Sequence, residues 1–254
     1  MIDDCLYEMN KVYDTDNYLY FTRDLVDDEL TEKEVKFLVE TLKLDTASDV
    51  LDLPCGYGRH SNRLAPLVGS VTGIDASEAY VNLAIGDAEE RGVKVDYLVG
   101  DMRQMSFEAS FDAVLVLFTS FGMFSHSDNL KVLEGIANSL RPGGRFCIEM
   151  MNPVPLSPNF KKNFVFEKAR NLMIDRLSYD SDTNRFMSNR IYIKDGHRQD
   201  GLMSYEIFSF EQMEVLMKPL GMKISQIFSN TTGGVFTKDS PKMVLVGEKS
   251  RSVE

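Results

Sequence analysis

The sequence of 254 residues has little cysteine and no long apolar run. Cys5, Cys55 and Cys147 are widely spaced and form no C-x-x-C pair, which argues against a zinc framework and favours a reducing, cytoplasmic setting. No apolar run approaches the roughly 18 residues of a membrane-spanning helix, and the opening segment is acidic where an export signal would be basic. We therefore expect a protein that is neither exported nor membrane-spanning.

Basic residues are also scarce relative to acidic ones. The 28 lysines and arginines stand against 39 aspartates and glutamates, so the formal net charge is -11. Nucleic-acid binding requires clustered positive charge, and the sequence has no obvious basic face. A nucleic-acid substrate is therefore disfavoured, a small molecule is the expected partner, and a homodimer stays open.

Short apolar runs alternate with helical patterns over the first 152 residues. Strands are predicted at 49–54, 70–75, 95–101, 111–118 and 145–151, and helices at 30–44, 59–67, 77–92 and 128–140. In the first helix, Thr31 and Glu34 resemble a capping box. Apolar strands separated by helices indicate a mostly parallel sheet covered on both faces, so we predict a doubly wound α/β fold.

The alternation breaks at "NPVPLSPNF", residues 152–160, whose three prolines predict a hinge or linker. Three alternating segments follow, at 171–180, 185–196 and 201–210, and they read as antiparallel strands. A helix and two closing strands complete the chain. We therefore divide it into a main domain, 1–152 with 210–254, and an inserted antiparallel sheet, 153–209, expected to cover the carboxyl ends of the main strands.

A glycine-rich turn joins the first predicted strand to its helix in "VLDLPCGYGRHSNRLA", residues 50–65. Gly56 and Gly58 let a ligand approach the backbone, with a helix amino terminus just beyond. Pro54 has no N–H, so it can shape the loop but cannot donate to a ligand. Ser61 is a weak fit to the third small residue of a dinucleotide fingerprint, which disfavours a dehydrogenase. A purely structural turn is the alternative.

Aspartates lie at the ends of the next two predicted strands. Asp75 can accept hydrogen bonds from both hydroxyls of a ribose, although a solvated strand-end aspartate is the plain alternative. Asp101 can accept from an adenine amine, while the Met102 N–H meets a ring nitrogen and its side chain packs on the purine. These features fit one adenosine, with no site evident for a pyrophosphate.

Several segments in order carry a family resemblance. "DLPCGYGRH", "GIDAS", "GDMRQM", "FDAVLVLFTSFGMF" and "LRPGGRFCIEMMNP" resemble the class I S-adenosylmethionine-dependent methyltransferases, and more closely their small-molecule branch. The resemblance covers roughly 30–152 and the closing "DSPKMVLVGEK". The family pattern usually has glycine at the position of Pro54, which we interpret as a local variation. The resemblance implies a seven-stranded Rossmann-like sheet whose last strand is antiparallel.

The resemblance also implies residue roles. Asp52 would lie near the ammonium end of the methionine moiety, Asp75 would hold the ribose, and Asp101 with Met102 would hold the adenine. Phe118 would run under the sulfonium. The predicted cofactor-binding set is Asp52, Pro54, Gly56, Gly58, Asp75, Ala76, Asp101, Met102, Arg103 and Phe118. No metal site is predicted.

The implied reaction is methyl transfer from S-adenosylmethionine to a nitrogen or oxygen of a small molecule by in-line displacement. Because the leaving thioether is neutral, the enzyme mainly aligns the reactants and excludes water, so a base is optional. The catalytic candidates are His126, just beyond the fourth main strand, and Tyr18, in a segment that folds over the cofactor in similar proteins. A surface histidine and a packing tyrosine are the plain alternatives.

A second class of function stays open. The chain could bind the cofactor, or its demethylated product, without turnover, as a sensor or an inactive partner. The inserted sheet favours an enzyme, because a cover over the main strands implies an acceptor pocket. No motif identifies the acceptor.

Overall fold

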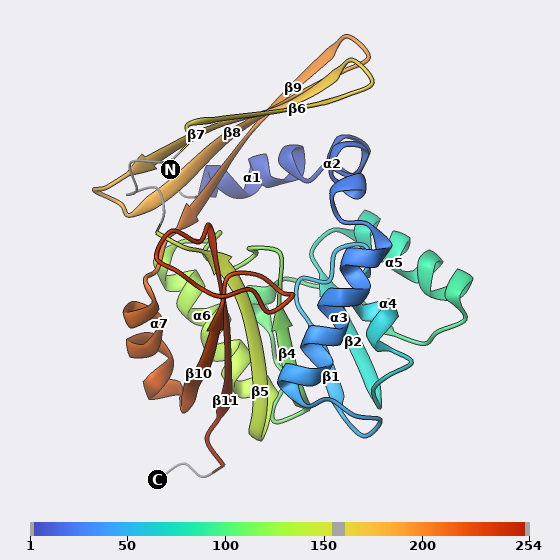
Figure 1. Ribbon diagram of the computed structural model, residues 1–254, viewed down its shortest axis with the longest axis vertical. Helices are drawn as coiled ribbons and strands as arrows, with labels where there is room; N and C mark the ends of the chain where they lie inside the picture. The colour runs from blue at the N-terminus through green and yellow to red at the C-terminus, as the bar shows by residue number, and fades with distance from the viewer. Residues whose placement is uncertain (1–2, 154–160, 252–254) are drawn as a thin grey trace.

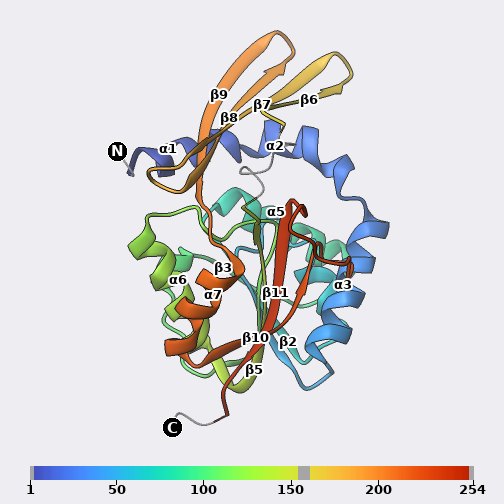
Figure 2. The same ribbon diagram turned by 60° about the vertical axis from the view of Figure 1, so that its left-hand side comes forward.

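The computed structural model describes residues 3–153 and 161–251, with side chains from residue 8 onward. An α/β body forms the lower part of the molecule, and a second sheet lies above it with the amino-terminal helices between the two (Figures 1 and 2). The carboxyl ends of the main strands face these helices. The space between body and upper layer is therefore where a ligand site is expected.

The body contains one mixed sheet with helices on both sides. Its strand order is β10-β11-β5-β4-β1-β2-β3, and β11 alone runs in the direction opposite to the other six strands. This confirms the predicted fold and the antiparallel last strand. The elements are α3 (Asp28–Leu42), β1 (Asp49–Asp52), α4 (Ser61–Leu64), β2 (Ser70–Asp75), α5 (Glu78–Arg91), β3 (Asp96–Val99), η2 (Met102–Gln104), β4 (Phe111–Val116), α6 (His126–Ser139), β5 (Leu140–Met151), α7 (Phe210–Met217), η4 (Lys218–Leu220), β10 (Met222–Phe228) and β11 (Lys242–Lys249).

The central strands are apolar because both of their faces are buried. Leu51 and Val114 pack into a core shared with α6 and α7, whereas Val50 and Leu115 pack into a core shared with α3. Figure 2 shows α6 and α7 on one side of the sheet and α3 on the other. Successive residues of a strand point to opposite faces, so two buried faces require an unbroken apolar run.

Two local predictions in the body are wrong. The predicted capping box is absent because α3 begins earlier than expected. The Asp27 carboxylate caps the helix by accepting the Leu30 N–H at 2.8 Å, and Glu34 is buried and does not cap the helix. The helix predicted at 59–67 is reduced to the four residues of α4. Pro66 follows closely and lacks the N–H that another turn would use.

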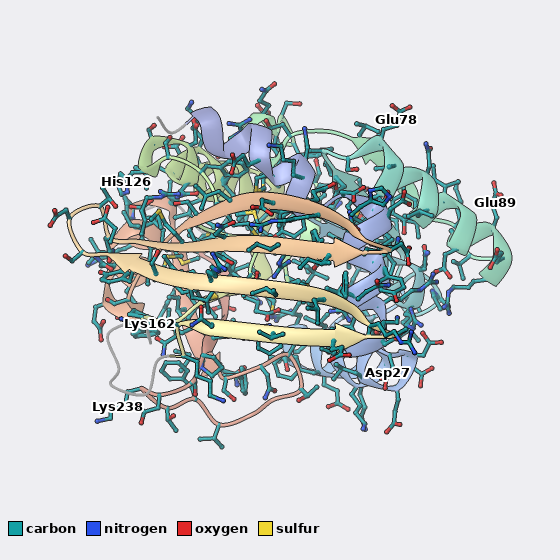
Figure 3. All side chains as sticks on the ribbon, turned by 90° about the horizontal axis from the view of Figure 1, so that it is seen from above. Asp27, Glu78, Glu89, His126, Lys162 and Lys238 are labelled. Carbon is teal, nitrogen blue, oxygen red and sulfur yellow. The ribbon has the colours of Figure 1, made fainter. Side chains whose placement is uncertain are left out.

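The upper layer is called the roof here and comprises α1 (Asp3–Val12), α2 (Thr15–Thr22), η1 (Arg23–Leu25) and a four-stranded antiparallel sheet. The strands are β6 (Asn163–Lys168), β7 (Asn171–Asp180), β8 (Arg185–Lys194) and β9 (His197–Glu206), in that order. Figure 3 looks down on these strands lying across the body. The sheet has one strand more than the three predicted. The predicted hinge at 152–160 lies almost entirely outside the described residues.

The extra strand, β6, escapes prediction because it forms an edge with little burial. Phe164 and Val165 are both exposed, so the alternation of buried and exposed residues that marks a strand is missing. The other edge, β9, packs against α1. The Tyr192 hydroxyl on β8 donates to the Val12 carbonyl at 2.6 Å. Segments about 180 residues apart in the chain therefore form one layer.

Candidate functional site

A cavity of about 560 Å³ lies between the carboxyl ends of β1, β2, β3 and β4 and the amino-terminal helices. Ligand pockets commonly measure roughly 300 to 1,000 Å³, so the cavity can hold a nucleoside-sized molecule. The glycine turn, the ends of β2 and β4 and the segment after β3 form its floor and walls. Tyr18 on α2 and Tyr13, in the turn between α1 and α2, line the roof side. The residues of the floor and walls that matter below are Pro54, Gly56, Arg59, His60, Asp75, Ala76, Tyr80, Asp101, Met102, Arg103 and Phe118.

The glycine turn presents one glycine to the cavity and buries the other. Gly56, at φ +55°, lines the cavity, whereas Gly58, at φ +78°, does not. A Cβ on Gly58 would come within 2.3 Å of the Tyr97 hydroxyl, so this glycine is required by packing. Asp52 is also outside the lining: it is buried, and its carboxylate accepts the Ser61 hydroxyl at 2.5 Å. Burial raises the pKa of Asp52.

Asp75 ends β2 with its carboxylate fixed from both sides. One oxygen accepts the Gly56 N–H at 2.9 Å, and the other accepts the Ser77 N–H at 2.9 Å. Burial raises the pKa of Asp75, although these two donors favour its charged form. Each carboxylate oxygen has a second lone pair, so the group can still accept hydrogen bonds from a ligand.

Asp101 and the two residues after it line the adjacent wall. The Asp101 carboxylate accepts the Arg103 backbone N–H at 2.9 Å and the Arg103 Nε at 2.9 Å. Burial raises the pKa of Asp101, but the hydrogen bonds and charge of Arg103 outweigh it, and the pKa is lowered. The Arg103 guanidinium lies 4.7 Å from the centre of the Phe124 ring. An adenine amine at Asp101 would therefore share the carboxylate with Arg103.

Phe118 leaves β4 in an unusual backbone conformation. Phe118 and Thr119 have φ values of +59° and +58°, which non-glycine residues seldom adopt and which are often found at functional sites. The Phe118 N–H donates to the buried Glu149 carboxylate at 2.8 Å, and Lys242 pairs with the same carboxylate at 2.6 Å. The Arg59 guanidinium and the Lys242 ammonium each lie 5.2 Å from the ring centre. The ring thus lies in the cavity wall with two cations close to it.

A buried carboxylate anchors the residues that follow the glycine turn. Glu34 on α3 pairs with Arg59, lies 3.0 Å from Nε2 of His60 and accepts the Thr231 hydroxyl at 2.7 Å. Burial raises the pKa of Glu34, but His60 and Arg59 outweigh this effect and lower it to about 2. Arg59 and His60 both line the cavity, so an ionised Glu34 holds this part of its wall.

Tyrosines form the roof side of the cavity. The Tyr13 and Tyr205 hydroxyls lie 2.8 Å apart, and the Tyr13 and Tyr18 rings meet edge to face at 5.0 Å. The Arg190 guanidinium lies 6.0 Å from the centre of the Tyr18 ring and is held by Asp175 through two hydrogen bonds of 2.8 Å. Burial raises the pKa of Tyr18, so its hydroxyl stays protonated. The inserted sheet therefore positions Tyr18.

His126 is not brought into the cavity. It begins α6, its side chain is 59% exposed, and its Nδ1 lies 2.7 Å from Oε1 of Glu206 at the end of β9. Figure 3 shows it at one margin of the molecule seen from above. His126 thus links α6 to the inserted sheet.

Most of the predicted residues meet at the cavity, and three do not. Those in the lining are Tyr18, Pro54, Gly56, Asp75, Ala76, Asp101, Met102, Arg103 and Phe118, whereas Asp52, Gly58 and His126 lie outside it. Their roles stay predictions. Sequence reasoning missed Tyr80, Arg59 and Tyr13. In the sequence, Tyr80 and Arg59 could be noticed only because they lie near the motifs, and Tyr13 only because it belongs to a tyrosine-rich segment.

Residues 3–153 and 161–251 contain neither a candidate metal site nor a candidate membrane span. No group of three or more His, Cys, Asp or Glu side chains there could hold a metal ion. Within the same ranges, no helix combines the length and apolar character needed to cross a membrane.

Comparison with known proteins identifies related chains. Residues 50–144 match the family model described as a methyltransferase domain. A ubiquinone biosynthesis O-methyltransferase of Xanthomonas axonopodis pv. citri is 36% identical over 109 residues, which are 42% of this chain and 44% of the relative. The chain therefore spans less than half the length of this curated relative.

Solved structures share the fold over most of their length. An S-adenosylmethionine-dependent methyltransferase from Clostridium acetobutylicum superposes with a TM-score of 0.80 at 18% identity, covering 94% of this chain and 99% of that one. CalS10 of Micromonospora echinaspora, an amino pentose methyltransferase solved with S-adenosylmethionine bound, has a TM-score of 0.66 at 18% identity, covering 87% and 91%. At such identities the likeness concerns the fold.

Proposed function

The chain belongs to the class I S-adenosylmethionine-dependent methyltransferases, and from that premise we propose that it methylates a nitrogen or oxygen of a small molecule. One observation carries the proposal. The glycine turn, Asp75, the segment Asp101–Arg103 and Phe118 line one continuous cavity under a roof. The cofactor would lie along this wall, and the acceptor would lie between it and the roof.

The residues present fit the cofactor. Asp75 offers a rigid carboxylate for two vicinal hydroxyls, and Met102 supplies an apolar surface beside the Asp101 carboxylate for a purine. Phe118, flanked by Arg59 and Lys242, lies in the same wall. S-adenosylmethionine, when bound, supplies a methyl group activated by a positively charged sulfur.

The contribution of the chain is alignment and exclusion of water. The glycine turn and Asp75 would hold one reactant, and the roof would close over the other, so that nucleophile, methyl and sulfur lie in line. Tyr18 keeps its proton, because burial raises its pKa. We therefore assign Tyr18 to orienting the acceptor through its hydroxyl rather than to removing a proton. His126 has no place in this arrangement.

The residues on the roof side of the cavity and the names of similar proteins support a class of acceptor. The similar proteins include one named a ubiquinone biosynthesis O-methyltransferase and, among the structures that share the fold, one named an amino pentose methyltransferase. The roof side of the cavity combines tyrosine rings with Asp14 and Asn10. Such a lining suits a compact molecule with both a ring and polar groups. We infer an acceptor of this class, a phenol-like or amino-sugar-like metabolite.

Calorimetry and a turnover screen test the proposal. Titration with S-adenosylhomocysteine and with NAD should show clear binding of the first and weak or no binding of the second. A screen of amino sugars and phenols with S-adenosylmethionine should then yield S-adenosylhomocysteine with at least one acceptor. Tighter binding of NAD would refute the cofactor assignment. Cofactor binding without turnover on any acceptor would favour the non-catalytic alternative.

A further inference from the structure

Arg59 presents unused hydrogen-bond donors in the cavity wall. The residue is 8% exposed and lines the cavity. Its Nη1 donates to the Glu34 carboxylate and to the Thr31 hydroxyl, whereas its Nε and Nη2 have no hydrogen-bond partner among the described residues. Neither nitrogen is sealed inside the protein, because the Tyr80 hydroxyl is the one described buried side-chain oxygen or nitrogen that is both enclosed and unpaired. The guanidinium is therefore held through Nη1 and has two donors left for a ligand.

These two donors suit a carboxylate. The guanidinium fork matches the two oxygens of a carboxylate, so one group can accept both hydrogen bonds. The described lining contains two arginines and no lysine. The other arginine, Arg103, is already engaged: its Nε and Nη2 donate to the Asp101 carboxylate, and its Nη1 lies 3.7 Å from the Asp128 carboxylate. Arg59 is therefore the better site for an anion in this cavity.

The order of the strands places Arg59 at the end of the site opposite Asp101. Strands β4, β1, β2 and β3 are neighbours in that order, and they lead into Phe118, the glycine turn, Asp75 and Asp101, respectively. Neighbouring strands lie about 4.8 Å apart, so the four ends span roughly 14 Å. The Arg59 guanidinium lies 5.2 Å from the centre of the Phe118 ring, at the β4 end. A ligand whose adenosine is held at Asp101 and Asp75 would extend its remaining part towards Arg59.

We propose that Nε and Nη2 of Arg59 bind the carboxylate in the amino-acid half of S-adenosylmethionine. The inference rests on the proposed function. This carboxylate is the one anionic group of the cofactor, and Arg59 offers it a charged pair of donors. Asp52, predicted to lie near the same half of the cofactor, is outside the lining and accepts the Ser61 hydroxyl instead. Glu34 becomes a positioning residue, because it fixes the guanidinium through Nη1.

Three ligands separate the carboxylate from the rest of the cofactor. S-adenosylhomocysteine carries it, the decarboxylated amine analogue lacks it alone, and 5′-methylthioadenosine lacks the whole amino-acid half. Calorimetry should show that Arg59→Met binds S-adenosylhomocysteine about tenfold to a hundredfold more weakly, as for the loss of charge-assisted hydrogen bonds. Affinity for 5′-methylthioadenosine should equal that of the wild type, and affinity for the amine analogue should not fall.

A second variant guards against misfolding, because Arg59→Met leaves the buried Glu34 carboxylate without its partner. Arg59→Met combined with Glu34→Gln removes both charges, so it should be more stable than Arg59→Met alone. It should show the same loss of affinity for S-adenosylhomocysteine. Glu34→Gln alone weakens the support but keeps the guanidinium. That variant should therefore still prefer S-adenosylhomocysteine to the amine analogue.

Arg63→Met is the matched control. Arg63 lies on α4, pairs with Asp28 and is not part of the cavity lining. The variant removes the same charge from the same region, so all three affinities should stay at the wild-type level. A loss for S-adenosylhomocysteine as large as that of Arg59→Met would attribute the effect to net charge and overturn the inference.

Each remaining outcome has a definite meaning. Unchanged affinity for S-adenosylhomocysteine in both variants that lack Arg59 overturns the inference and leaves the proposed function intact. An equal loss for all three ligands would show that Arg59 supports the wall without binding the carboxylate, which also overturns it. A raised KM for the acceptor with unchanged cofactor affinity would assign the guanidinium to the acceptor, contrary to the proposal. If the wild type binds neither S-adenosylhomocysteine nor 5′-methylthioadenosine, the proposed function fails and the inference fails with it.

Discussion

The body and the roof hold their cavity residues by different means. In the body, Asp75 is fixed by the backbone N–H groups of Gly56 and Ser77, which belong to the adjoining turns. In the roof, Tyr13 is held by the hydroxyl of Tyr205, which lies 192 positions further along the chain. The first arrangement follows from the strand ends themselves, whereas the second depends on particular side chains of the inserted sheet. We therefore expect substitutions in the roof to impair the acceptor side of the cavity more than the cofactor side.

The largest expected effect comes from breaking the ion pair inside the roof. Arg190→Met leaves the buried Asp175 carboxylate without its partner, at side-chain exposures of 13% and 11% for the pair. Such a loss typically costs about 3 to 5 kcal/mol, so urea denaturation should show a marked loss of stability. Turnover should fall, because Tyr18 loses the guanidinium that packs on it.

Arg198→Met is the control for the roof pair. Arg198 pairs with Asp200 on β9, and both side chains are exposed. Stability and turnover should both stay at the wild-type level. Equal effects of the two variants would show that the roof is not held by its buried pair.

A second prediction concerns the carboxylate that joins α3 to the glycine turn. The pKa of Glu34 is lowered to about 2, so the stability it contributes is complete above its usual pKa of 4.5 and is lost as the pH falls towards 2. Glu34→Gln should cost about 3 kcal/mol at neutral pH, because Arg59 loses its buried partner. Below pH 4.5 the variant should lose less stability than the wild type does.

Denaturation midpoints measured across this pH range check the second prediction. Glu40→Gln is the control, because Glu40 is exposed on the same helix and pairs only loosely with Lys36, at 3.8 Å. A wild-type pH profile that Glu34→Gln leaves unchanged would contradict the assignment of acid sensitivity to Glu34.

The third prediction concerns Asp75, on the body side of the cavity. Asp75→Asn keeps the shape of the side chain and one acceptor oxygen, but it removes the charge and the second acceptor. Loss of charge-assisted hydrogen bonds should cost about 1.5 to 3 kcal/mol of binding, so the dissociation constant for S-adenosylhomocysteine should rise about tenfold to a hundredfold. Asp112→Asn, at the amino end of β4 and outside the lining, should leave binding unchanged. An unaltered constant in a folded Asp75→Asn protein would remove Asp75 from the site.

The smallest effect is expected at the join between body and roof. His126 is largely exposed, lies outside the cavity and contacts Glu206. His126→Gln should keep kcat/KM within about threefold of the wild type, because general acid–base catalysis typically contributes at least about a hundredfold. A hundredfold loss of kcat, measured with the acceptor found by the screen, would restore His126 as the catalytic base.

Most of the body could be predicted because its signals are local. Buried parallel strands are apolar on both faces, and the single glycine turn is followed by aspartates at the ends of the next two strands, Asp75 and Asp101. The first residue of α3 is harder to predict from the sequence, because Asp27 and Thr31 both suit the N-cap position. The sequence pattern places Glu34 in a capping box at the start of the helix, whereas its partners in the structure, Arg59, His60 and Thr231, are distant in the sequence.

The roof shows the limit of local signals. The exposed edge strand β6 has no alternating pattern, so it was missed. The sequence offers both His126 and Tyr18 as candidates, His126 because it lies just beyond the fourth main strand and Tyr18 because its segment folds over the cofactor in similar proteins. Only the packing of α1 and α2 on the inserted sheet separates them, by placing Tyr18 in the cavity and His126 at its outer margin.

The sequence by itself determined the fold class and the residues at the strand ends that line one wall of the cavity, and the family resemblance added the antiparallel last strand. These features depend on periodicity and on turns of a few residues, where each residue's neighbours in the chain are also its neighbours in space. The tertiary structure alone decided the roof, the burial of Glu34 and the unpaired hydroxyl of Tyr80. Whether a polar group finds a partner depends on side chains brought together from distant segments, and no local pattern records that outcome.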